Sequence, residues 1–161
     1  MADAPARDFF DKARELVSAA LFVAGALAIV GSLLDWVTFT LDPPLFGVIA
    51  PRPSDPISGF DVGDGWLVAG AGVVLIAAAF LLVLRRRAGF AGLGLLASMF
   101  IGAIAISDYR GVGDLTSDLA RELDLVGEPH AAIGLTLVVA ASILGLIASV
   151  AGIAATPRGR S

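Results

Sequence analysis

The sequence predicts an all-α membrane protein, a bundle of four transmembrane helices joined on one side of the membrane by two outer loops. Of its 161 residues, 57% are hydrophobic and only 16% are charged. Ordinary soluble domains are about 45–50% apolar and about 25% charged. The apolar residues form four long uncharged runs, and basic residues flank these runs unevenly. We expect the whole chain, residues 1–161, to form a single membrane domain.

Each of the four runs is long enough to cross a bilayer as a helix. They cover residues 16–34, 66–84, 88–106 and 131–155. About 20 apolar residues in a helix span a hydrocarbon core of about 30 Å. Only a helix satisfies its own backbone hydrogen bonds there, and these runs lack the polar stripe of a helix in a soluble protein. The first run has no small-x-small cleavage site before Asp35, so we expect an uncleaved helix.

The basic residues predict the direction of the helices. One side of the membrane receives only Arg52, Arg110 and Arg121. The other side receives Arg7, Lys12, Arg14, Arg85, Arg86, Arg87, Arg158 and Arg160. Loops rich in Lys and Arg stay in the cytoplasm, so we expect both termini and the turn at residues 85–87 to be cytoplasmic.

Aromatic and arginine side chains mark the expected membrane boundaries. Trp36, Trp66 and Tyr109 are the only Trp and Tyr residues, and all fall at the outer ends of the predicted helices. Their largely apolar rings with one polar atom suit the headgroup region, so we expect them to be interface anchors. The arginines at residues 85–87 are the expected anchors at the opposite boundary.

The two outer loops, residues 35–65 and 107–130, have local patterns of their own. The alternating stretch WVTFTL at 36–41, the turn residues DPP at 42–44 and a second apolar run at 45–50 indicate a short β-hairpin. In the second loop, leucines recur at helical spacing between residues 115 and 123. This spacing predicts a short amphipathic helix that lies flat on the outer surface.

A short string is repeated 64 positions apart, in front of the second and fourth runs. It reads VGDGW at 62–66 and VGEPH at 126–130, and the same shift matches Gly70 with Gly134. We expect Asp64 and Glu128 to cap the helices that follow, because an acid there accepts hydrogen bonds from free N–H groups. Internal duplication would produce this repeat, and so would shared physical constraints on two similar helix starts.

Two further acids, Asp35 and Asp108, are expected at helix C-termini, where the helix dipole disfavours an anion. Solvation or pairing with an outer-loop arginine would stabilise them. Alternatively, they would form an outer cation site together with Asp64 and Glu128. Divalent cations prefer several carboxylate and carbonyl oxygens, but the chain has no EF-hand-like spacing.

Small residues fall about one turn apart in the predicted helices. Faces with small residues at every fourth position let helix backbones approach closely in lipid. The residues that we expect to form packing faces are Gly94, Ser98 and Gly102 in the third run and Ala141, Gly145 and Ser149 in the fourth. We expect packing within one chain first, with self-association as the alternative.

The sequence offers little for catalysis or cofactor binding. None of the four runs contains an ionisable residue, which a proton relay or coupled transporter usually needs. The absence of cysteine excludes disulfides and thiolate metal sites. The single histidine, His130, has no candidate nucleophile near it in sequence, and DVGDG lacks the lysine of a phosphate loop. We therefore expect no catalytic residue, no cofactor and no nucleic-acid partner.

Three segments, GSLLDWVTF at 31–39, GFDVGDGWL at 59–67 and LRRR at 84–87, together resemble small four-helix membrane proteins that are common in actinobacteria. Most of the chain fits that plan, and the resemblance implies a multi-pass protein of a bacterial plasma membrane. These proteins have no assigned activity. The order of elements is also similar to that of claudins, by topology only, because the cysteine pair of the claudin first loop is absent.

Two functions agree with these features. We expect a non-catalytic membrane subunit, a scaffold or an accessory or assembly factor of a cell-envelope or membrane complex. Its partners would be the lipid bilayer and other membrane subunits, or further copies of itself. The alternative is binding or transport of a cation, lipid or small molecule at the acidic outer face or in the bundle core.

Overall fold

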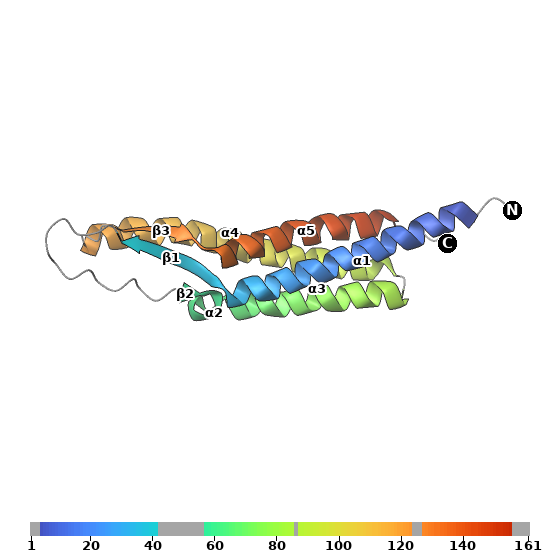
Figure 1. Cartoon of the computed structure of the whole chain (residues 1–161), viewed down its shortest axis with the longest axis horizontal. Helices are drawn as coiled ribbons and strands as arrows, with labels where there is room; N and C mark the ends of the chain where they lie inside the picture. The colour runs from blue at the N-terminus through green and yellow to red at the C-terminus, as the bar shows by residue number, and fades with distance from the viewer. Residues whose placement is uncertain (1–3, 42–56, 86, 124–126, 156–161) are drawn as a thin grey trace.

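Four long helices lie side by side in the structure, a computed structural model that describes residues 4–41, 57–85, 87–123 and 127–155 (Figure 1). They are α1 (Ala4–Leu33), α3 (Gly65–Arg85), α4 (Ala88–Leu123) and α5 (Ile133–Ala155). Each contains a segment that is long and apolar enough to cross a membrane. These candidate spans are Asp11–Leu33, Gly65–Arg85, Gly89–Gly111 and Ile133–Ala155. The predicted fold class, a four-helix membrane bundle, is confirmed.

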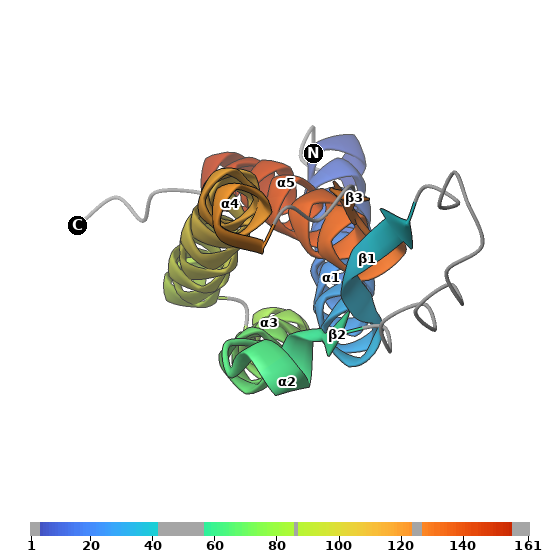
Figure 2. The same ribbon diagram turned by 90° about the vertical axis from the view of Figure 1, so that its left-hand side faces the viewer.

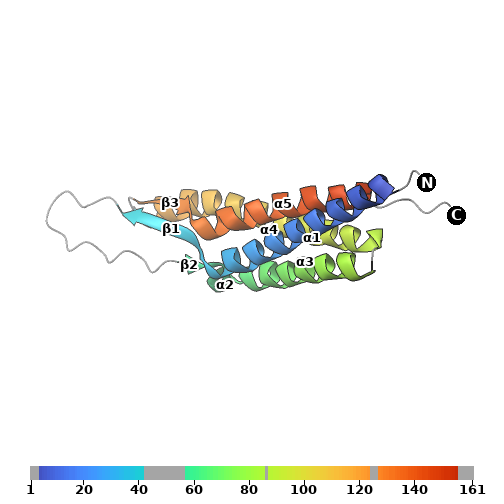
Figure 3. The same ribbon diagram turned by 45° about the vertical axis from the view of Figure 1, so that its right-hand side comes forward.

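The four helices form a ring in which every neighbour is antiparallel. α1 packs against α3 and α5, and α4 packs against the same two helices from the opposite side (Figure 2). The start of α1, the end of α5 and the α3–α4 connection lie at one end of the bundle, while the strands lie at the other end (Figure 3). α3 ends at Arg85 and α4 begins at Ala88, and so short a connection makes these two helices antiparallel neighbours.

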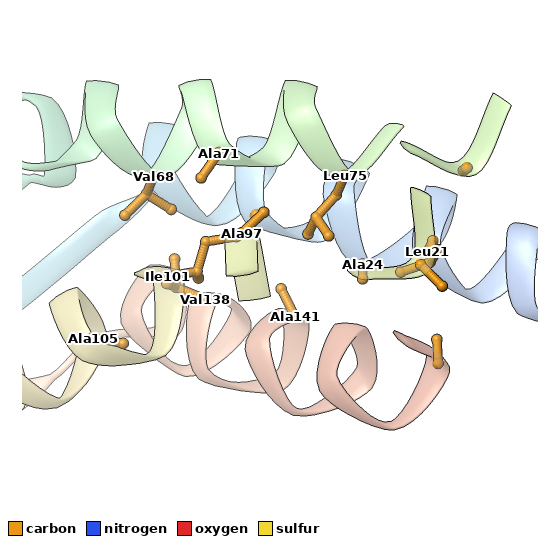
Figure 4. Packing of buried hydrophobic residues seen from close by; sticks show 14 of the residues in the cluster. Leu21, Ala24, Val68, Ala71, Leu75, Ala97, Ile101, Ala105, Val138 and Ala141 are labelled. Carbon is orange, nitrogen blue, oxygen red and sulfur yellow. The ribbon is translucent and has the colours of Figure 1, made fainter. Parts of the chain in front are cut away.

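Side chains from all four helices meet along the axis of the bundle (Figure 4). The completely buried apolar residues include Leu21, Ala24, Val68, Leu75, Ile101, Val138 and Ala141. Large apolar side chains also cover the outside, among them Phe80, Leu96 and Ile147. Lipid is as apolar as these side chains, so close packing and hydrogen bonds between helices hold such a bundle together.

α4, which corresponds to the third predicted run at 88–106, is longer than the sequence predicted. α4 continues without a break to Leu123, so it includes the segment that we expected to be a separate surface helix. That prediction is wrong, because Gly111 and Gly113 each weaken a helix by about 1 kcal/mol but do not interrupt it as proline would. A helix of 36 residues is about 54 Å long, so its last turns extend beyond the candidate span.

Three strands join the two outer loops. β1 (Asp35–Leu41) pairs antiparallel with β2 (Ile57–Ser58) on one edge and with β3 (Gly127–Ala131) on the other. The strand predicted at the start of the first loop is therefore present, and its β-branched and aromatic residues suit it. Its longer partner comes from the second loop. The run at 45–50, which we expected to pair with it, lies outside the described residues.

The two copies of the repeated string do not have the same structure. Asp64 directly precedes α3, and its carbonyl oxygen accepts hydrogen bonds from the amides of Leu67 and Val68 at 3.0 and 3.1 Å. Glu128 lies in β3 opposite Thr40, and α5 begins only at Ile133. The capping role predicted for Glu128 is therefore wrong, because the paired strand continues past it.

Candidate functional site

Trp36 lies inside the end of the bundle that carries the strands, which we name the outer end, where α1 ends and β1 begins. Its side chain is 1% exposed, and its Nε1–H donates a hydrogen bond to the carbonyl oxygen of Gly31 at 2.9 Å. Its own carbonyl accepts a hydrogen bond from the amide of Ala132 at 2.9 Å, directly before α5. The interface role predicted for Trp36 is therefore wrong, because protein encloses the ring and keeps it away from the headgroup region.

Two glycines leave the space that this arrangement needs. Gly59 begins the short helix α2 (Gly59–Val62), and a Cβ there would overlap the indole of Trp36. A Cβ on Gly134 of α5 would lie 2.6 Å from the carbonyl oxygen of Asp35 and 2.8 Å from that of Gly31. Backbone therefore packs against backbone around the indole, and this end of the bundle has one close-fitting arrangement.

The outer end also holds an acid with one buried oxygen that has no hydrogen-bond partner. Asp108 is half-buried on α4, in the interior of the helix and not at its C-terminus, which corrects the prediction for this residue. Its Oδ2 atom is buried and has no hydrogen-bond partner. Asp64, in front of α3, is close enough for its charge to act on Asp108. Two like charges therefore interact where α3 begins and α4 leaves its candidate span.

The four acids of the predicted cation site are only partly brought together. Asp35 is half-buried as the first residue of β1, and the side chain of Glu128 lies outside the described part. Among the described residues, no group of three His, Cys, Asp or Glu side chains could hold a metal ion. Asp64 and Asp108 are the pair in electrostatic contact, and the cation site stays a prediction.

The other predicted boundary residues lie at the two ends of the bundle. Trp66 lies in the first turn of α3 and Tyr109 near the end of the candidate span in α4, and each is 62% exposed. Arg85 and Arg87 are exposed at the opposite end, and Arg86 lies outside the described residues. Their contact with lipid headgroups stays a prediction.

The small residues predicted on α4 and α5 lie against each other, in an alternating arrangement. Three glycines of this interface each face a serine of the other helix, so that a Cβ on the glycine would meet the serine hydroxyl. The pairs are Gly94 with Ser149 at 2.9 Å, Gly102 with Ser142 at 2.6 Å, and Gly145 with Ser98. The two helix backbones approach closely because neither side carries a large side chain here.

Two of these serines also form hydrogen bonds to backbone. Ser142 Oγ donates across the interface to the carbonyl oxygen of Ser98 at 3.1 Å, and Ser98 Oγ donates to that of Gly94 at 2.8 Å. Ser149 Oγ is buried without a partner. The sequence prediction named buried Ala141 but missed Ser142, because it looked for small residues at every fourth position. A spacing that alternates between three and four residues would have found Ser142.

A second close contact, between α1 and α3, was also missed. A Cβ on Gly25 would lie 2.6 Å from the carbonyl oxygen of Gly72, and one on Gly72 would lie 2.8 Å from that of Gly25. Further along, Ser18 Oγ donates to the carbonyl oxygen of Ala79 at 2.9 Å. The sequence does not distinguish Gly72 from exposed Gly70, because both are small residues in one apolar run.

No family model, no curated protein and no solved structure matches this chain.

Proposed function

We propose that the protein is a non-catalytic subunit of a membrane or cell-envelope complex, acting as a scaffold or as an accessory or assembly factor. The observation that carries this proposal is the outer module, defined as β1, β2, β3 and the part of α4 after Gly111. β1 pairs with β3, and β3 packs against α4, so both outer loops contribute to one folded unit. A structured unit at one end of a membrane bundle suits recognition of another protein.

The packing of the bundle supports a structural role. Glycine, alanine and serine contacts hold α1 against α3 and α4 against α5. Closely packed interiors are rigid and deform little. A rigid bundle would fix the outer module relative to the membrane, as a scaffold requires.

The proposal includes a location and a direction. The chain would lie in a bacterial plasma membrane, with both termini and the α3–α4 connection in the cytoplasm. The outer module would then lie on the extracytoplasmic side, where it could contact envelope components. The basic residues at the cytoplasmic end and the resemblance to actinobacterial four-helix proteins support this placement.

Site-specific crosslinking in intact cells would identify the partner. A photoreactive amino acid at position 40 in β1 or position 128 in β3 is expected to give the same crosslinked species. The reason is that these two positions are paired neighbours in the outer module. The same amino acid at position 87, at the opposite end, is the control and is expected not to give that species.

The mass of the crosslinked species separates two kinds of partner. A species of twice the 16.4 kDa of the chain would identify a second copy, and any other mass would identify a different subunit. A strictly monomeric chain at all three positions, together with no co-purifying protein in mild detergent, would contradict the proposal.

Cation binding near Asp64 and Asp108 is a second candidate function, favoured by the buried, unpartnered Oδ2 of Asp108. A bound cation would neutralise the repulsion between the two carboxylates. Thermal unfolding of the wild-type protein is then expected to move to higher temperature when Ca²⁺ or Mg²⁺ is added.

The Asp108→Asn variant tests this candidate against a purely structural role. Without added cation, the variant is expected to be more stable than wild type by about 1 kcal/mol, because it removes a partly buried charge whose Oδ2 atom accepts no hydrogen bond. It is also expected to lose the cation-dependent shift. Asp11→Asn, at the opposite end of the bundle, is the control. A wild-type protein that no cation stabilises would rule this function out.

A further inference from the structure

The short helix α2 is held against the outer ends of two candidate membrane spans. The amide of Gly59 donates a hydrogen bond to the carbonyl oxygen of Leu34, directly after α1, at 3.4 Å. A Cβ on Gly65, the first residue of α3, would lie 2.6 Å from the carbonyl oxygen of Gly59 and 2.7 Å from the amide nitrogen of Phe60. The backbone of α2 therefore packs on the first turn of α3, beside the end of α1 (Figure 1).

The connection from α2 to α3 is also tight. Gly63 has a φ of 98°, a left-handed backbone conformation that favours glycine. Its amide donates a hydrogen bond to the carbonyl oxygen of Phe60 at 3.2 Å. Only Gly63 and Asp64 separate α2 from α3, so α2 stays close to the level at which α3 begins.

The exposed apolar surface of the spans continues onto α2 at this level. The candidate span in α1 ends at Leu33, the one in α3 begins at Gly65, and Leu33 and Trp66 are 61% and 62% exposed. Phe60 belongs to no candidate span, yet its side chain is 44% exposed at the same level. A bilayer surrounds the whole bundle, so an exposed side chain at this level meets lipid whichever way around the bundle it points.

We propose that Phe60 anchors α2 in the lipid interface at the outer end of the bundle, where the headgroups meet the acyl chains. Helical segments with an apolar side chain on the membrane side bind at this depth. Asp61 and Asp64 follow Phe60 in the chain, and charged groups are costly at the bilayer centre but stay hydrated among headgroups. The acids therefore limit α2 to the boundary region.

This anchor divides the outer module into two parts. β2 directly precedes α2, so it lies beside the lipid headgroups, whereas β1 continues away from the bundle beyond this level (Figure 1). The surface left for a protein partner is then the far part of β1, together with β3 and the end of α4. The anchor depends on the chain spanning a membrane and not on the proposed role as a subunit.

Tryptophan fluorescence of the full chain in liposomes measures the depth of α2. The reporter is Phe60→Trp combined with Trp66→Phe, and Trp66→Phe alone gives the background from buried Trp36. We expect lipids brominated near the headgroup end of the acyl chains to reduce the emission from position 60 more than lipids brominated near the methyl end. Iodide on both sides of the bilayer is expected to cause little loss. A loss caused chiefly by iodide would overturn the proposal, because α2 would then face water.

Two comparisons calibrate the depth. Phe100 is exposed in the middle of the candidate span of α4, so Phe100→Trp with Trp66→Phe is expected to lose more emission to bromine near the methyl end. Trp66 of the wild-type protein needs no substitution in α2 and is expected to show the same order as position 60. If both behave in this way while iodide quenches position 60, the spans lie in the membrane and only the anchoring role of Phe60 is wrong. A larger loss at position 60 to bromine near the methyl end would also contradict an interfacial anchor.

Discussion

Replacing Trp36 with alanine is expected to lower the free energy of unfolding by about 3–5 kcal/mol, the usual effect of removing a large buried aromatic side chain. The indole is almost completely buried at the point where α1, α2, β1 and α5 meet. Truncation would leave a cavity there and would remove the hydrogen bond to the carbonyl of Gly31. Thermal or denaturant unfolding in detergent would measure the loss.

Two further variants test the core role of Trp36. One separates the hydrogen bond of the indole from its apolar volume, and the other is an exposed control. Trp36→Phe retains most of the apolar volume but loses the Nε1–H donor, so a smaller loss of about 1 kcal/mol is expected. Trp66→Ala removes the only other tryptophan, which is largely exposed, and is expected to change stability by less than about 0.5 kcal/mol in detergent. Equal losses in Trp36→Ala and Trp66→Ala would show that Trp36 is not a core residue.

The sequence predicted the four helices because the physical requirement for crossing lipid is local. An uncharged run of sufficient length forms a helix wherever it lies in the chain, so composition and length were enough. β3 could not be predicted in the same way. Its sequence GEPHA has little strand propensity and contains a proline, and it forms a strand through pairing with β1. Such a pairing depends on residues about ninety positions away.

The outer end of the bundle illustrates the same limit for individual residues. Trp36 follows an apolar run, and this position is typical both of an interface anchor and of a ring that folds back into the protein. The choice between them depends on Gly59, whose missing side chain leaves room for the indole. Asp108 was placed at a helix end because its apolar run stops there, whereas α4 continues past it through polar residues.

The packing faces of α4 and α5 were easier to predict from the sequence. Small residues at helical spacing have one main use in lipid, which is close helix contact, and Gly94, Ser98 and Gly145 lie in such a contact. The sequence could not indicate which helix each face would meet. It also could not separate glycines at contacts from glycines that face lipid, and Gly134 and Gly70 provide a direct test of that difference.

Gly134→Ala is expected to lower the free energy of unfolding by about 1–3 kcal/mol, the usual range for overpacking a close contact. The added methyl group would lie 2.6–2.8 Å from three backbone carbonyl oxygens, those of Asp35, Gly31 and Leu34. Backbone at the end of a helix cannot rotate away as a flexible side chain would. The start of α5 would therefore have to move from the end of α1, and unfolding in detergent would measure the loss.

Gly70→Ala is the matched control, because the repeated sequence pattern puts Gly70 and Gly134 at equivalent positions. A Cβ on Gly70 has no atom of another residue within 4 Å, apart from its own helix turn and chain neighbours. Alanine also favours a helix over glycine by about 1 kcal/mol, so this variant is expected to be as stable as wild type or slightly more stable. Equal destabilisation of both variants would mean that the two halves of the chain pack in the same way and that the contact of Gly134 with the end of α1 is incorrect.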